Sequence, residues 1–213
     1  MAKQHLPSVD SLFAAAENRI SCYSLNNSSP IPESRIEEIV RNTVKHAPSS
    51  FNVQSARAVI LFKDENQALW DIGDRILKET QSEDLYKMAA SIASRSKNGY
   101  GSVLWFEDQE ALDGLANKNP PFKDVVPQWS ATSSGMHQYL VWTALELEGL
   151  GCNLQHFNFM PEFTEEVKKR YQLPQSWKLM SQLVFGHPGE EGLVRKKERT
   201  YQSLDDRVKV VGA

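Results

Sequence analysis

The sequence predicts an α+β domain in which several helices surround a mixed central sheet. The chain has 213 residues, 40% of them hydrophobic, which suits one globular domain with a buried core. Helical and strand-like patterns follow one another in mixed order, as is typical of the α+β class. No internal repeat and no linker rich in glycine, serine or proline divides the chain, so we expect residues 1–213 to form a single domain.

Capping residues and helical periodicity predict the first two helices. Ser8 can cap a helix that runs to about Arg19. Pro32 and Glu33 open a second helix, which Pro48 ends. Apolar residues at helical spacing predict further helices over 66–77, 83–94, 108–115 and 161–171.

Short apolar runs predict strands over 57–62, 101–106, 152–157 and 178–185. The tail at 206–211 alternates weakly between apolar and polar residues, which indicates a further edge strand. Residues 117–129 contain three prolines and show no periodicity. We therefore expect an irregular connection in that segment.

Residues 133–150 form the longest predicted helix, and it has almost no polar face. A helix that is apolar nearly all round is buried on nearly all sides. In a domain of this size another subunit can provide the extra apolar surface, so the pattern predicts a homodimer.

Charge and cysteine content argue against several functional classes. The net charge of -3 and the pI near 6.0 give no general attraction for nucleic acid or anionic membranes. No apolar run approaches the roughly 20 residues that span a bilayer, and no signal-peptide pattern begins the chain, so we expect a cytoplasmic protein without a membrane partner. Cys22 and Cys152 lie far apart and the histidines lack metal-ligand spacing, which predicts free thiols and no metal site.

Three polar segments lie in otherwise apolar surroundings: Arg19–Tyr23, Ala47–Gln54 and Gly149–His156. The second contains a helix-ending proline, two serines, Asn52 and Gln54 directly before an apolar strand. Such a loop can offer hydrogen bonds to a flat heteroaromatic ligand. The alternative is a turn held by asparagine and serine side chains, although that explains Gln54 less well.

Together the three segments resemble the FMN-dependent nitroreductase family. The similarity follows the chain in order and includes Phe185–Pro188 (Phe-Gly-x-Pro) before Arg199. The segments 99–108, 129–136 and 154–156 resemble the compact fungal and bacterial branch, which is linked with nitroaromatic, quinone and oxidative-stress chemistry. The resemblance implies a nitroreductase-like fold and an intertwined homodimer with FMN sites at the subunit interface.

The resemblance also implies which residues bind FMN. Arg19 and Ser21 match an Arg-x-Ser motif, in which a guanidinium can donate two hydrogen bonds to the phosphate. Leu204-Asp205-Asp206 sets the register that makes Arg199 the second phosphate cation, and its alternative is an exposed charge in a basic loop. The loop after Pro48 would reach the flavin across the subunit boundary, and 154–156 would lie near N5. The full implied set is Arg19, Ile20, Ser21, Tyr23, Pro48, Ser49, Ser50, Asn52, Gln54, Leu154, Gln155, His156 and Arg199.

Two positions depart from the pattern of many family members. Tyr23 replaces a basic residue near flavin N1 and O2, and a phenol can hydrogen-bond that edge but cannot neutralise it. Tyr201 replaces a second phosphate-binding arginine. Phosphate binding is therefore left to Arg19 and Arg199, with Lys197 as a further candidate.

The implied activity is reduction of nitroaromatic or quinone-like acceptors by NAD(P)H, with hydride passing through flavin N5 in a ping-pong reaction. This scheme requires no dedicated catalytic acid or base, so we predict none. Two alternatives stay open: a flavin oxidase or peroxide-handling enzyme, and a non-catalytic FMN-binding redox sensor.

Overall fold

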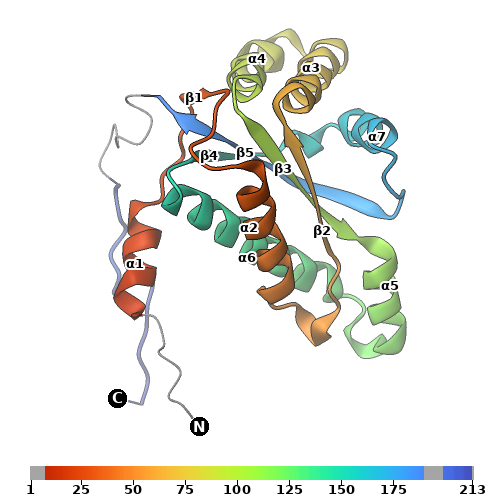
Figure 1. Ribbon diagram of the computed structural model, residues 1–213. Coiled ribbons are helices and arrows are strands. Elements are labelled where there is room, and N and C mark those ends of the chain that lie inside the picture. Colours follow the sequence, from red (N-terminus) through yellow and green to blue (C-terminus); the bar gives the residue numbers. More distant parts are fainter. Residues whose placement is uncertain (1–7, 190–198, 213) are drawn as a thin grey trace.

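The computed structural model describes residues 8–189 and 199–212, and its strands form a sheet enclosed by helices (Figure 1). The strands are β1 (Leu25–Asn26), β2 (Ala56–Phe62), β3 (Gly101–Asp108), β4 (Gly151–Gln155) and β5 (Trp177–Pro188). The strand order is β1-β5-β3-β2, β4 also pairs with β5, and all of these pairs are antiparallel. A parallel bridge between Ser21 and Cys152 makes the sheet mixed, as the sequence predicts.

Helices cover both faces of the sheet. They are α1 (Val9–Asn18), α2 (Glu33–His46), α3 (Lys63–Thr80), α4 (Glu83–Lys97), α5 (Gln109–Lys118), α6 (Val126–Leu147) and α7 (Pro161–Arg170). Helices α2 and α6 pack on one face, and α3, α4 and α7 lie on the other (Figure 1). The α+β class is therefore confirmed.

Strand β3 is buried on both faces, and its side chains divide by the two-residue period of a strand. Val103 and Trp105 join the core with α2 and α6, whereas Leu104 and Phe106 join the core with α3 and α7. The apolar run that predicted this strand thus supplies both hydrophobic cores. Glu107, the next residue, is a buried charge at the end of that run.

The structure corrects three expected boundaries. Residues 117–129 are not wholly irregular, because a 3₁₀ turn spans Pro120–Phe122 and α6 begins at Val126. Pro127 lies in the first turn of α6, where a missing N–H breaks no helical hydrogen bond. The predicted helix over 133–150 therefore starts earlier and ends at Leu147. The strand predicted to reach Phe157 ends at Gln155, and Phe157 opens a 3₁₀ turn.

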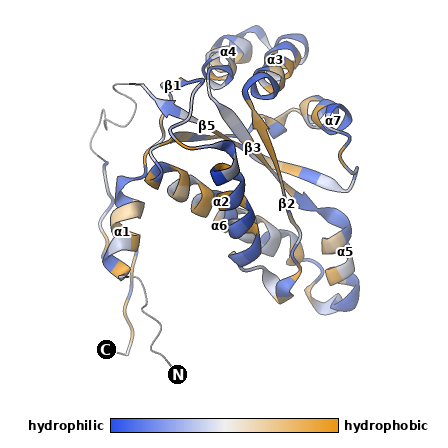
Figure 2. Ribbon diagram, in the orientation of Figure 1, coloured by the Kyte–Doolittle hydropathy of each residue, from blue (hydrophilic) through white to orange (hydrophobic). Residues whose placement is uncertain are grey.

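The expected edge strand at 206–211 is wrong for a single chain. Val208 N–H donates to the Leu204 carbonyl in a turn, and the rest of the described tail makes no strand. Figure 1 shows α1 and this tail extending away from the sheet. Both carry apolar residues on their surfaces (Figure 2), among them Phe13, Val208 and Val210.

Candidate functional site

The first polar segment lies beside β4. The backbone N–H of Cys22 donates to the Cys152 carbonyl over 2.8 Å, and Asn153 Nδ2 donates to the Cys22 carbonyl over 2.7 Å. These bonds bring Arg19–Tyr23 next to the first half of β4. Both cysteines are free and buried, and burial raises the pKa of both thiols.

The two predicted phosphate cations meet in space. Arg199 donates from its guanidinium to the backbone carbonyl of Arg19, although the two residues lie at opposite ends of the chain. The Arg19 guanidinium stacks over Trp142 of α6 with 4.4 Å between its central carbon and the ring centroid. Both arginines are half-buried. The arrangement is a two-cation corner that can donate several hydrogen bonds to a phosphate. Lys197, the further candidate, lies outside the described residues.

A carboxylate that belongs to no sequence motif supports this corner. Glu146 accepts a hydrogen bond from Ile20 N–H over 3.1 Å and another from Trp142 Nε1 over 2.8 Å. Burial is the largest influence on this group and raises the pKa of the Glu146 carboxyl. The two hydrogen bonds and the nearby positive charges of Arg19 and Arg199 act in the opposite direction on the same pKa. Its only signal in the sequence is an acid within an apolar helix.

The loop Pro48–Gln54 is backbone-strained. Phe51, Asn52 and Gln54 all have φ near +50°, in the left-handed region that residues other than glycine seldom adopt. Strain of this kind clusters at binding and catalytic sites. Gln54 N–H donates to Ser49 Oγ over 3.0 Å, which confirms part of the alternative in which serine side chains hold a turn.

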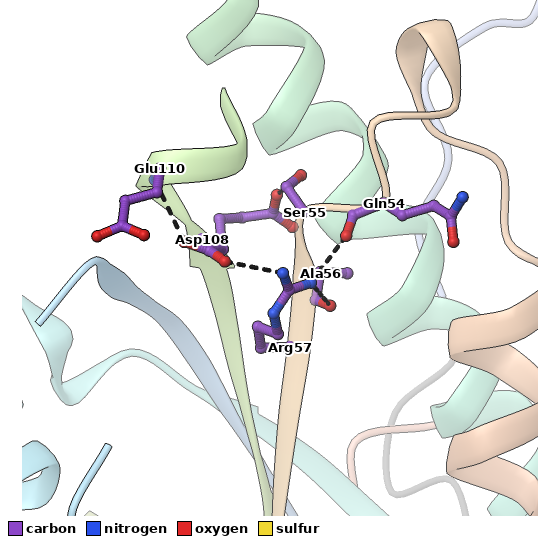
Figure 3. A network of polar contacts seen from close by, with 7 residues as sticks. Gln54, Ser55, Ala56, Arg57, Asp108 and Glu110 are labelled. Atoms are coloured by element: carbon purple, nitrogen blue, oxygen red, sulfur yellow. Dashed lines mark hydrogen bonds and ion pairs between the residues drawn. The ribbon is translucent and has the colours of Figure 1, made fainter. Parts of the chain in front are cut away.

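The side-chain amides of this loop remain available. Asn52 and Gln54 are exposed, and their amide groups make no hydrogen bond within the described parts of the chain. Figure 3 shows the Gln54 side chain pointing away from the polar network beside it. The loop therefore presents two side-chain amides, each a donor and an acceptor, on a backbone fixed by the bond from Gln54 N–H to Ser49.

The loop and the two-cation corner lie at different ends of α6. Ser133 Oγ donates to the Pro48 carbonyl over 2.7 Å, whereas Trp142 and Glu146 contact Arg19 and Ile20. Nine to thirteen residues of helix separate these contacts, which corresponds to about 14–20 Å at 1.5 Å per residue. One chain therefore brings the first and third segments together and leaves the second apart.

The third segment runs along β4 from Cys152, which lies beside Ser21, to His156. Leu154 is half-buried and His156 is exposed. Gln155 is buried, and its Nε2 donates to Asn153 Oδ1 over 2.7 Å. The Gln155 side chain is thus used within the chain, and the imidazole of His156 is the most accessible polar group of the three.

Tyr23 and Tyr201 are both exposed. The Tyr23 ring lies 5.5 Å from the guanidinium carbon of Arg95 on α4, so a cation stands beside the residue that replaces the usual basic side chain. The sequence carries no motif at Arg95. Among the described residues no group of three acids, cysteines or histidines could hold a metal, and no helix there is long and apolar enough to cross a membrane.

The fold is that of an α+β protein with a sheet between two helical layers, and it carries two arginines in contact at one corner and a strained polar loop. The model of the Nitroreductase family matches residues 16–187. The chain therefore belongs to the nitroreductase family, as its motifs suggested.

Individual relatives agree with this assignment. The nitroreductase FRM2 of Saccharomyces cerevisiae is 32% identical over 176 residues, which cover 82% of this chain and 86% of that protein. The nitroreductase CinD of Lactococcus lactis has a structure with a TM-score of 0.82 and 35% identity, covering 94% of this chain and 99% of that one. A nitroreductase structure from S. cerevisiae gives a TM-score of 0.70 and 29% identity, covering 86% and 98% respectively. Family and fold support a flavin-dependent oxidoreductase of the nitroreductase type.

Proposed function

We propose that this protein binds FMN and uses NAD(P)H to reduce nitroaromatic or quinone-like acceptors. The observation that carries the proposal is the contact between Arg19 and Arg199 beside the start of β4. Two guanidinium groups at one corner suit a dianionic phosphate. The exposed residue His156 and the backbone around it would then lie along the ring, and Ser21 would face the ribityl end.

The available groups fit this cofactor at its other edge as well. The isoalloxazine ring presents both hydrogen-bond donors and acceptors, and the unused amides of Asn52 and Gln54 offer both. FMN would supply the redox chemistry, so that NAD(P)H and the acceptor would each react at the same site in turn, in a ping-pong sequence. The role of this chain is to hold the phosphate, orient the ring and leave one ring face open to each substrate in turn.

The site requires a second copy of the chain, because the loop after Pro48 is separated from the two-cation corner within one chain. We propose a homodimer in which each loop serves the partner's flavin. Helix α6 supports this with an exposed apolar stripe at Met136, Tyr139, Leu140 and Leu147. A stripe at helical spacing that is left uncovered marks an interface.

The tail gives a second reason for a dimer. Strand β2 is the edge of the sheet, and a groove of about 660 Å³ runs between it and α2. The groove is lined by apolar residues of β2 and α2 and by Arg41, Lys45, Arg57 and Glu37. The exposed tail carries apolar Val208 and Val210 among charges of both signs at 205–209. The proposal is that the tail of a second copy docks there, which would supply the neighbour that the predicted edge strand lacks in one chain.

Relatives support the acceptor class and the electron donor. Structures of L. lactis CinD contain chloramphenicol, 4-nitrophenol and nicotinic acid. Two of these compounds carry a nitro group on an aromatic ring, and the third shares its ring with nicotinamide. At 35% identity over 94% of this chain, we propose the same ligand classes here.

Steady-state turnover tests the proposed function. The FMN-reconstituted protein should oxidise NADH or NADPH at a rate that depends on an added nitroaromatic or quinone, with or without oxygen. Turnover that needs oxygen would instead indicate an oxidase. Flavin binding without turnover by either donor would indicate a sensor.

A further inference from the structure

A buried carboxylate is hydrogen-bonded to the residue that directly follows the strained loop. Glu107 of β3 is 1% exposed, and its Oε2 accepts from Ser55 Oγ over 2.6 Å and from Ser130 Oγ over 2.8 Å. Ser55 directly follows Gln54, and Ser130 belongs to α6. One carboxylate oxygen therefore joins the sheet, the exit of the loop and the long helix.

The arrangement is costly for folding. Glu107 Oε1 is buried and has no hydrogen-bond partner in the part of the chain that the structure describes. A buried carboxyl with one unpaired oxygen destabilises a protein relative to an apolar side chain of similar size. The neighbouring residues of β3, Trp105 and Phe106, show that the strand otherwise takes large apolar side chains. Global stability therefore does not account for a glutamate at this position.

A second contact fixes the same stretch of backbone from its other side (Figure 3). Arg57 donates to the Gln54 carbonyl over 2.7 Å and to Asp108 Oδ2 over 2.8 Å. Asp108 in turn caps α5 by accepting from Glu110 N–H over 3.2 Å. The left-handed residue Gln54 thus lies between an ion pair at the edge of the sheet and the buried pair of Ser55 with Glu107.

We propose that Glu107 is a positioning residue for the flavin ring. Through Ser55 and Ser130 it fixes the exit of the loop relative to α6, and so sets where the amides of Asn52 and Gln54 stand. It touches no ligand itself. This inference rests on the proposed FMN site. It adds that binding of the isoalloxazine ring depends on the buried carboxylate of Glu107.

The two ends of the cofactor make the inference testable, because riboflavin has the ring of FMN and lacks the phosphate. Apoprotein is titrated with each ligand, at concentrations where every variant sediments like the unmodified protein. Glu107→Ala and Ser55→Ala should weaken FMN and riboflavin by the same factor, about tenfold, as expected for one lost hydrogen bond to a charged group. Glu107→Gln, which can still bond both serines, should restore affinity to within about threefold.

A control separates positioning from general destabilisation. Ser102→Ala removes a buried hydroxyl from the same strand, where it bonds Asn66 and Trp70 on the α3 side, away from the loop. It should lower the thermal unfolding temperature without changing either affinity. If Glu107→Ala does not fold, Ser55→Ala and Ser130→Ala carry the test, since each removes one hydroxyl and leaves the carboxylate bonded to the other.

The outcomes distinguish the two proposals. Unchanged affinity for both ligands in folded Glu107→Ala and Ser55→Ala would overturn the positioning role, as would a loss confined to FMN. Failure of Glu107→Gln to rescue would also overturn it. Failure of Arg19→Ala to weaken FMN more than riboflavin would instead refute the phosphate site, and with it the proposed function.

Discussion

Removing one arginine of the two-cation corner should weaken FMN binding, and the contacts of that arginine limit the expected loss of affinity. Arg199 is half-buried and already oriented by its bond to the Arg19 carbonyl, so little ordering is lost when it contacts phosphate. A hydrogen bond to a charged group contributes about 1.5–3 kcal/mol. Arg199→Ala should therefore raise the dissociation constant of FMN about 10- to 150-fold. Glu146, whose carboxylate stands near both arginines, offsets part of their charge and favours the lower half of that range.

Arg19→Ala should show a similar loss and one additional effect. Its guanidinium stacks on Trp142, and a cation–π contact at a partly exposed site contributes about 0.5–1 kcal/mol. This variant should therefore also unfold slightly more easily in the absence of FMN. Arg199→Lys keeps the charge and loses the paired donors, so its affinity should fall between those of the unmodified protein and Arg199→Ala.

Titration of apoprotein followed by flavin fluorescence measures these constants, with riboflavin as the ligand that lacks the phosphate. Lys87→Ala makes the same change in net charge at an exposed site on α4 and should bind FMN normally. The reasoning is refuted if both alanine variants bind FMN like the unmodified protein. An equal loss for riboflavin would also refute it, because the arginines would then be acting on the ring or on folding.

Three other predictions concern the interface, the ring edge and the pH response. Leu140→Glu places a charge in the exposed stripe of α6 and should shift the sedimentation coefficient to that of a monomer. Flavin binding should weaken in the same variant. If Leu140→Glu remains a stable dimer, the interface lies elsewhere. Tyr23→Lys should raise the flavin reduction potential by about 20 mV, from a charge interaction of about 1 kcal/mol at a partly solvated site. Arg95→Ala should lower the potential, because it removes the cation beside Tyr23. If redox titrations give an unchanged potential for both variants, Tyr23 does not lie at the ring edge. The raised pKa of Glu146 means that the folded state holds its proton to higher pH than the unfolded state, so this group lowers stability as pH rises from the usual carboxyl range through its folded pKa. Urea unfolding of Glu146→Gln should lack that fall, and identical pH profiles for the two proteins would contradict the assignment.

Local signals were enough to predict most elements, and they failed where the deciding contact was not local. Apolar runs located β2, β3 and β5 because buried strands need such residues whatever surrounds them. The three prolines of 117–129 predict an irregular connection, but Pro127 lies in the first turn of α6, where proline is compatible with a helix. The tail alternates like a strand, but a strand requires a neighbour, and residues 8–189 and 199–212 provide none for it within one chain.

The site shows the same division. The family motifs predict that Arg19 and Arg199 bind the phosphate; the fold brings the Arg199 guanidinium to the Arg19 carbonyl, and the phosphate role stays a prediction. Glu107 and Glu146 belong to no motif. Glu107 accepts a hydrogen bond from Ser55, and Glu146 accepts one from Ile20 N–H, so each fixes a segment of the site through a non-local contact. Each leaves a weak trace in the sequence, an acid directly after two or more apolar residues. An acid after apolar residues is more often exposed, so this pattern identifies a buried carboxylate only when its hydrogen-bond partners are known.

The anaerobic visible spectrum of the FMN-reconstituted protein tests the central claim most directly. NADH or NADPH should bleach the band of the bound flavin, and a nitroaromatic or quinone added after removal of the nucleotide should restore it without oxygen. A protein that shows no flavin band after reconstitution, or whose bleached band returns with oxygen but not with any nitroaromatic or quinone, would contradict the account.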